Sequence, residues 1–224
     1  MKNNIYIIIF FTIILTGCEK FLDKEPLDQI SSSSYWKTPD DLKLYVNQFY
    51  TSFPSNAYYN NEAADCNSDN VVLNVYDEVL AGSRVVPASG GGWSWTGIRS
   101  VNYFLTHYKT VEASWEGISQ YVGEAHFFRA YLYFLLVQRF GDVPWITKPL
   151  NSKSEELFFK KTPRIQVIDS IVADLDKAIS YMKPKGQISG FRINKQVALA
   201  FKSRVCLFEG TWEKYHSGTD FGSS

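Results

Sequence analysis

Five segments of the chain repeat apolar residues at three- and four-residue spacing, and this periodicity constrains the fold more than any other feature. The spacing places the apolar residues of each segment on one face of an α-helix. Proline or glycine follows several of the segments, as at Pro54, Pro144 and Gly186. Helices are therefore predicted at residues 39–53, 98–109, 119–140, 163–183 and 194–210.

Three of these helices carry signals for their first residue. Thr38 precedes Pro39 and stands three positions before Asp41, which is the pattern of a capping box with proline at the first helical position. Thr162, before a proline, and Asn194 are predicted to cap the last two helices. These two caps lie 32 positions apart, and such a pitch is typical of tetratricopeptide-like helix pairs. The predicted fold is mainly α, with tetratricopeptide-like antiparallel helix pairs and long loop excursions.

The segment 119–140 contains eight consecutive apolar residues, from Ala130 to Val137. Apolar residues on every side of a helix indicate burial all round. The run is too short to span a bilayer. Leu132, Leu135 and Leu136 are therefore expected among the most buried positions. His126 and Arg129 precede this run, and we interpret both as structural residues held by buried partners.

The first residues of the chain have the pattern of a secretory leader. Lys2 is followed by the apolar run 5–15, which as a helix would extend only about 16 Å at 1.5 Å per residue. The next residues, Leu15-Thr-Gly-Cys18, resemble a bacterial lipobox, in which the cysteine becomes the lipidated first residue. The predicted organisation is a signal peptide at 1–17, lipid attachment at Cys18, a tether at 18–35 and a helical domain at 36–224.

Charge and aromatic content bear on the kind of ligand. Lys plus Arg equals Asp plus Glu, at 23 each, so no basic excess favours nucleic acid.

Trp93 and Trp95 follow three glycines in the loop-rich stretch 54–97, and alternation on an extended segment would point both indoles to one side. Indoles can stack on sugar rings, which makes the two residues candidate ligand contacts. The alternative, favoured here, is that at least one indole packs against the helix that begins at Ile98.

The same stretch resembles half of a calcium-binding loop. Asp65, Asn67 and Asp69 place oxygen side chains at positions 1, 3 and 5, but Asn70 and Tyr76 stand where glycine and glutamate are needed. A solvated loop, or contacts from Asn67 and Asp69 to a polar ligand, is the favoured interpretation. No metal site and no cofactor is predicted.

Cysteines and titratable residues give no support to catalysis. Cys206 lies in an apolar helical pattern and is expected to be buried, while its pairing with Cys66 is left open. His107, His126 and His216 lack metal-ligand spacing. Loop carboxylates make a glycosidase pair conceivable, but no motif supports one. A non-enzyme is predicted.

Four ordered stretches resemble one family. Residues 123–145, GEAHFFRAYLYFLLVQRFGDVPW, are similar to the signature helix and exit turn of SusD/RagB proteins, which are outer-membrane lipoproteins of Bacteroidetes. The segments 21–26, 163–179 and 192–210 resemble the family's mature N-terminus and its next two helices. Members of the family are much longer, so the chain resembles an N-terminal portion that is incomplete at its C-terminus.

The resemblance implies a function and a partner. It implies a cell-surface, lipid-anchored binding protein at the outer membrane, which captures oligosaccharides and delivers them to a SusC-like TonB-dependent transporter. Two alternatives stay open: a helical-repeat scaffold that binds only a protein partner, and a non-functional fragment. If 1–224 is the whole product, loss of the second half is expected to weaken or abolish oligosaccharide binding, because affinity depends on several contacts held together.

Overall fold

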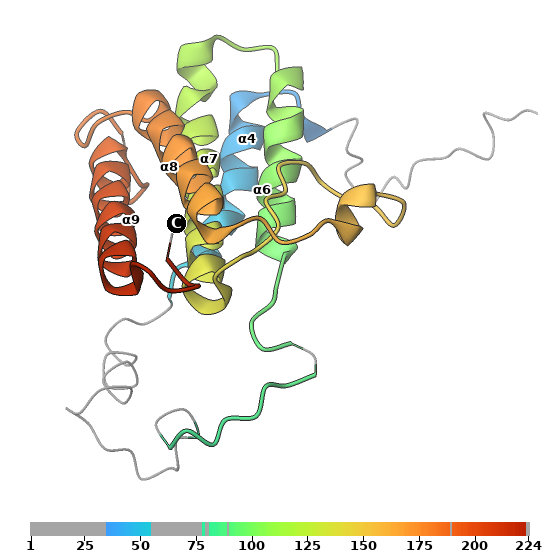
Figure 1. The fold of residues 1–224 in the computed structure, drawn as a ribbon. Helices are drawn as coiled ribbons and strands as arrows, with labels where there is room; N and C mark the ends of the chain where they lie inside the picture. Colours follow the sequence, from blue (N-terminus) through green and yellow to red (C-terminus); the bar gives the residue numbers. More distant parts are fainter. Residues whose placement is uncertain (1–34, 55–77, 79–80, 89, 189, 223–224) are drawn as a thin grey trace, which may run out of the picture. The chain divides into compact units, whose positions relative to one another are not determined.

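The computed structural model describes residues 35–54, 78, 81–88, 90–188 and 190–222, and it confirms a mainly helical fold (Figure 1). The described elements are α4 (Pro39–Asn47), η1 (Gln48–Ser52), α6 (Thr96–His107), η2 (Tyr108–Thr110), α7 (Trp115–Phe140), η3 (Glu155–Phe158), α8 (Arg164–Tyr181) and α9 (Lys195–His216). Within these ranges the β contact is an isolated antiparallel bridge between Val143 and Thr162. The predicted signal peptide and most of the tether, with Cys18, lie outside the described residues.

Two of the three predicted caps are confirmed. At the start of α4, Thr38 Oγ1 accepts a hydrogen bond from the Asp41 N–H at 3.3 Å, and Asp41 Oδ2 accepts one from the Thr38 N–H at 2.7 Å. These bonds from Thr38 hold the pKa of the Asp41 carboxyl below its ordinary value. At the start of α9, Asn194 Oδ1 accepts from the N–H groups of Gln196 and Val197.

The prediction that Thr162 caps the fourth helix was wrong. The N-cap of α8 is Pro163, and the first N–H of the helix, that of Arg164, donates to Asp142 Oδ1 at 2.8 Å. The Thr162 N–H donates to the Val143 carbonyl at 3.2 Å, and its hydroxyl accepts from the Trp145 N–H at 3.2 Å. Thr162 thus closes the loop between α7 and α8. We call residues 143–162 of this loop the strap.

Helix α7 forms the centre of the helical layer. It packs against α4 and α6 on one side and α8 on the other, and α9 follows α8 (Figure 1). Successive helices from α6 to α9 run antiparallel, as expected for tetratricopeptide-like pairs. Four of the five largest fully buried side chains in the described part of the chain are aromatic residues of α7, namely Phe127, Phe128, Tyr133 and Phe134.

Glycine at position 123 allows α7 and α8 to approach closely. A Cβ atom there would lie 2.6 Å from Met182 Cγ and 3.1 Å from the Met182 backbone nitrogen. Such distances are below normal van der Waals contact, so any side chain at this position would push the end of α8 away from α7.

A fully buried carboxylate on α7 binds both η1 and the segment just before α9. Glu124 accepts two hydrogen bonds from Arg192, at 2.8 and 2.7 Å, and one from the Tyr50 hydroxyl at 2.8 Å. The Ile193 N–H in turn donates to the Tyr50 oxygen at 3.0 Å. Moving η1 or the segment before α9 away from α7 would leave the buried Glu124 charge without its partners, which is strongly destabilising. The network therefore fixes both segments against α7.

The burial expected of three leucines in α7 is found for one of them. Leu136 is buried, but Leu132 is half-buried and Leu135 is 42% exposed. Both border a cavity of about 300 Å³ together with Gly97. The apolar run indicated burial on every side, but this face of α7 is only partly covered: Gly97 in the first turn of α6 lies against Leu132, and the cavity leaves Leu135 exposed.

Cys206 was expected to be buried, and this expectation was wrong. Helix α9 buries a narrow face, formed by Ala198, Val205 and Glu209. Cys206 lies outside this face and is exposed, as is Leu207. The apolar pattern of α9 therefore runs beyond the face that packs against α8. Cys66 lies outside the described residues.

Candidate functional site

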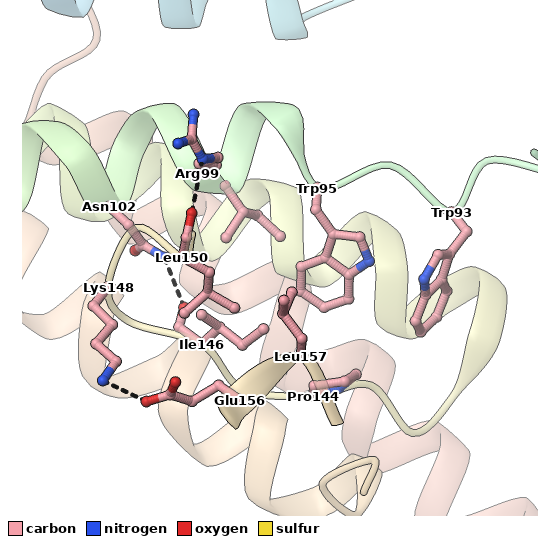
Figure 2. A pocket seen from close by; sticks show the side chains of 11 residues that line it. Trp93, Trp95, Arg99, Asn102, Pro144, Ile146, Lys148, Leu150, Glu156 and Leu157 are labelled. Atoms are coloured by element: carbon pink, nitrogen blue, oxygen red, sulfur yellow. Dashed lines mark hydrogen bonds and ion pairs between the residues drawn. The ribbon is translucent and has the colours of Figure 1, made fainter. Parts of the chain in front are cut away.

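A pocket of about 360 Å³ lies between the first turn of α6 and the strap (Figure 2). Trp93 and Trp95 form one wall, with their ring centroids 5.3 Å apart and their planes inclined by 73°. Trp93 is 39% exposed and Trp95 is half-buried. The two sequence-predicted aromatic residues thus line the same pocket, although they reach it from a turn and a helix start and not from an extended segment.

Each indole is also braced by an aromatic residue of α7. Trp93 lies edge-on to Phe140 at 4.9 Å, and Trp95 lies edge-on to Tyr133 at 5.9 Å. Packing against the core and exposure to the pocket therefore occur together in these residues. The bracing holds the rings in place, which lowers the entropy lost when a ligand binds to them.

Three successive glycines shape the approach to Trp93. Gly90, Gly91 and Gly92 have φ values of +76°, +64° and +88°, which side-chain-bearing residues rarely adopt. The turn is closed by hydrogen bonds from the Trp93 N–H to the Gly90 carbonyl and from the Ser94 N–H to the Gly92 carbonyl. A Cβ atom at Gly92 would meet the Arg139 guanidinium at 2.8 Å. The glycines therefore form a turn that sets the position of the aromatic wall.

The opposite wall consists of apolar strap residues, which Figure 2 shows facing the indoles: Pro144, Ile146, Leu150 and Leu157. The backbone of Ile146 anchors this wall. Its carbonyl accepts from Asn102 Nδ2 at 2.8 Å and from the Tyr133 hydroxyl at 2.9 Å, and its N–H donates to the Tyr133 oxygen at 2.7 Å. Burial raises the pKa of the Tyr133 phenol, so the hydroxyl keeps the proton that it donates.

A buried ionic network lies behind the strap anchor. Asp174 of α8 accepts two hydrogen bonds from Arg129, at 2.6 and 2.8 Å, and one from His126 Nδ1 at 2.9 Å. Arg129 Nη1 also donates to Asn102 Oδ1 at 3.2 Å, which connects the ion pair to the residue that holds Ile146. The prediction that His126 and Arg129 are structural residues with buried partners is confirmed.

The protonation states in this network follow from its surroundings. Burial alone would raise the pKa of Asp174, but the hydrogen bonds from His126 and Arg129 outweigh it and the pKa is lowered. Burial lowers the pKa of His126, and its bond to Asp174 only partly opposes this. Neutral His126 therefore donates its Nδ1–H to an ionised Asp174.

The polar residues at the pocket come from α6 and the strap. Arg99 Nε donates to the Leu150 carbonyl at 3.4 Å, and Lys148 pairs with Glu156. Lys161 Nζ lies 5.7 Å from the centroid of the Trp93 ring. Sequence reasoning missed these residues, although Trp95 and Arg99 stand at the i, i+4 spacing that places side chains side by side on a helix.

The remaining candidate residues, Asn67 and Asp69, lie outside the described residues. Within the described ranges, no group of three or more His, Cys, Asp or Glu side chains is placed to hold a metal ion. None of the described helices combines the length and the apolar character needed to cross a membrane.

Comparison with known proteins identifies relatives along most of the chain. Residues 20–207 match a family model described as "Starch-binding associating with outer membrane". SusD-like protein P2 of Formosa agariphila is 24% identical over 93% of this chain, and SusD-like protein P38 of the same organism is 27% identical over 89%. A crystal structure of a SusD-like protein from Bacteroides fragilis superposes with a TM-score of 0.69 at 28% identity, over 85% of this chain.

These relatives are considerably longer. The chain spans 44% of P2, 41% of P38 and 39% of the Bacteroides fragilis protein. The helices and the pocket described above therefore correspond to less than half of each relative.

Proposed function

Because the chain belongs to the SusD-like family, we propose that it captures oligosaccharides at the cell surface with the pocket formed by α6 and the strap. The observation that carries the proposal is the aromatic wall, in which two braced indoles face an apolar pocket of about 360 Å³. Sugar rings present apolar C–H faces that can pack on an indole. A mostly apolar cavity with a few polar groups is also the common form of a small-molecule site.

The proposed role is binding without catalysis, followed by transfer to a partner. The family description links starch binding to association with the outer membrane. We propose a SusC-like TonB-dependent transporter as the partner that receives the oligosaccharide. The proposed location is the outer membrane, with the helical domain facing the cell exterior.

The test of saccharide binding is a titration of the protein with a panel of oligosaccharides. Binding is measured from the change in indole fluorescence and from the NMR signals of the indole N–H groups. The pocket offers one aromatic wall, so we expect weak but saturable binding, with Kd on the order of 0.1–1 mM. Trp95→Ala should raise Kd at least about tenfold, a loss of about 1.4 kcal/mol. Loss of the stacking surface is the physical reason.

Trp115→Ala is the matched control, because Trp115 is an exposed indole at the start of α7 that packs on Tyr181 and does not line the pocket. It should bind like the wild type. Equal affinity in the wild type and Trp95→Ala would contradict the assignment of this pocket. Binding of a protein partner without any saccharide would favour the scaffold function instead.

We also propose that residues 1–17 are a signal peptide, that Cys18 carries the lipid and that 18–35 tethers the domain. One acyl chain binds membranes only marginally, whereas several on one residue give a stable anchor. The full chain expressed in a Bacteroidetes host should partition into the detergent phase. Cys18→Ala should appear in the aqueous phase or be mislocalised, while Cys206→Ala should partition as the wild type does. Detergent partition of Cys18→Ala would overturn the lipid assignment.

A further inference from the structure

The few polar groups of the pocket carry its selectivity, because its walls are otherwise apolar. Asn102 is buried, and its amide nitrogen donates to Ile146 while its oxygen accepts from Arg129. Lys148 and Glu156 are paired with each other. Hydrogen bonding from Lys148 also lowers the pKa of the Glu156 carboxyl, so this carboxylate stays ionised with Lys148 beside it.

Arg99 is a charged residue of the described pocket lining whose terminal nitrogens have spare hydrogen-bonding capacity. Its Nε donates to the Leu150 carbonyl, which ties the guanidinium group to the strap (Figure 2). No carboxylate among the described residues pairs with its terminal nitrogens. A guanidinium fork can donate two parallel hydrogen bonds to a carboxylate or sulfate group.

The position of Arg99 relative to the aromatic wall suits a ligand that contacts both. The Arg99 N–H donates to the Trp95 carbonyl at 2.8 Å, so the two residues are one helical turn apart. Side chains at this spacing have Cβ atoms about 5–6 Å apart. In the structure the terminal nitrogens of Arg99 point away from the indoles (Figure 2), so a substituent on a sugar ring that stacks on Trp95 meets the guanidinium once this exposed side chain turns toward the pocket.

A second cation lies at the other indole. Lys161 Nζ is 5.7 Å from the Trp93 ring centroid, and no ion pair joins Lys161 to a carboxylate in the part of the chain that the structure describes. The described lining of the pocket contains one carboxylate, Glu156, which Lys148 already neutralises. The two indoles are thus accompanied by two cations without a carboxylate partner.

We propose that this pocket selects acidic saccharides, whose sugar ring stacks on the indoles while a carboxylate or sulfate group binds Arg99, with Lys161 adding to the positive potential. The proposal rests on the proposed function and narrows its ligand class. Because Arg99 is exposed, such a charged contact is screened by salt. A neutral oligosaccharide would leave the spare donors of Arg99 to water.

The test compares ligands that differ only in charge. A uronic acid tetrasaccharide is titrated beside its methyl ester, and a sulfated tetrasaccharide beside its desulfated form, at low and at high NaCl. The acidic member of at least one pair should bind at least tenfold more tightly, and salt should reduce that ratio. Which pair responds distinguishes carboxylate from sulfate recognition. Arg99→Gln should bring the ratio close to one, and Arg99→Lys should leave it intermediate, because lysine keeps the charge but lacks the fork.

Arg204→Gln is the control, since Arg204 is an exposed arginine of α9 and should leave the ratio unchanged. Thermal unfolding of each variant checks that the helical fold is intact. Equal binding of acidic and neutral members, or an unchanged ratio in folded Arg99→Gln, overturns the acidic selectivity while saccharide capture stands. Failure of every saccharide to bind the wild type overturns both.

Discussion

Replacing Asp174 with alanine should lower the free energy of unfolding by about 3–5 kcal/mol, the range for breaking a buried ion pair by removal of one partner. The change leaves the Arg129 guanidinium, 6% exposed, without its carboxylate and also removes the acceptor of His126. Urea denaturation followed by circular dichroism measures the loss.

Asp176→Ala is a matched control on the same helix. Asp176 pairs with Lys202, but its side chain is 57% exposed, and exposed pairs contribute only about 0–1 kcal/mol. Replacing both Asp174 and Arg129 with apolar residues should recover much of the stability, because no unpaired charge then stays buried. A loss below about 1 kcal/mol for Asp174→Ala would contradict the buried network.

The same network predicts that acid destabilises the protein. His126 has a folded-state pKa below its ordinary 6.5, so the unfolded chain takes up a proton near that pH that the folded chain does not. Stability should therefore begin to fall as the pH drops below about 6.5. Asp174, whose pKa is also lowered, stabilises the fold above the ordinary value of 3.8 and loses its contribution below it.

The helices could be read from the sequence because their signals are local. Helix caps and apolar spacing involve residues within one or two turns, and the caps at Thr38 and Asn194 were predicted correctly. Thr162 was misassigned because its actual partners, Val143 and Trp145, lie nearly twenty residues earlier in the chain. A local motif could not reveal that competing long-range role.

The site was predictable only in part, for the same reason. Trp93 and Trp95 stood out by composition and by the glycines before them. The opposite wall depends on Asn102 and Tyr133 fixing the backbone of Ile146, which is a contact across 13 or 44 positions of sequence. Burial was also misjudged at Cys206 and Leu135, because periodicity gives the apolar face of a helix but does not say whether another element covers it.

Replacing Phe128 with alanine should destabilise the protein about as much as Asp174→Ala. The free energy of unfolding should fall by about 3–5 kcal/mol, the usual range for truncating a buried phenylalanine. Phe128 is 0% exposed on α7. Its ring lies 5.0–5.8 Å from four other aromatic rings, which belong to Phe49, Tyr50, Phe53 and Phe127. The cavity left by truncation is closed off by η1, which the buried bond between Tyr50 and Glu124 holds in place, so the site has little freedom to collapse.

The position of Phe128 makes this variant a test of how α4 and η1 join the helical layer. Phe128→Leu keeps most of the apolar volume and should lose clearly less than Phe128→Ala. Phe191→Ala, at a fully exposed phenylalanine just before Arg192, should change the stability by no more than about 0.5 kcal/mol. Because the aromatic cluster lies on the far side of α7 from α8, Phe128→Ala and Asp174→Ala act on separate contacts, and their losses should add to within about 0.5 kcal/mol in the double variant. A double variant no less stable than either single one would mean that η1 and α8 are held by one shared contact network, and the two faces of α7 would then not be independent.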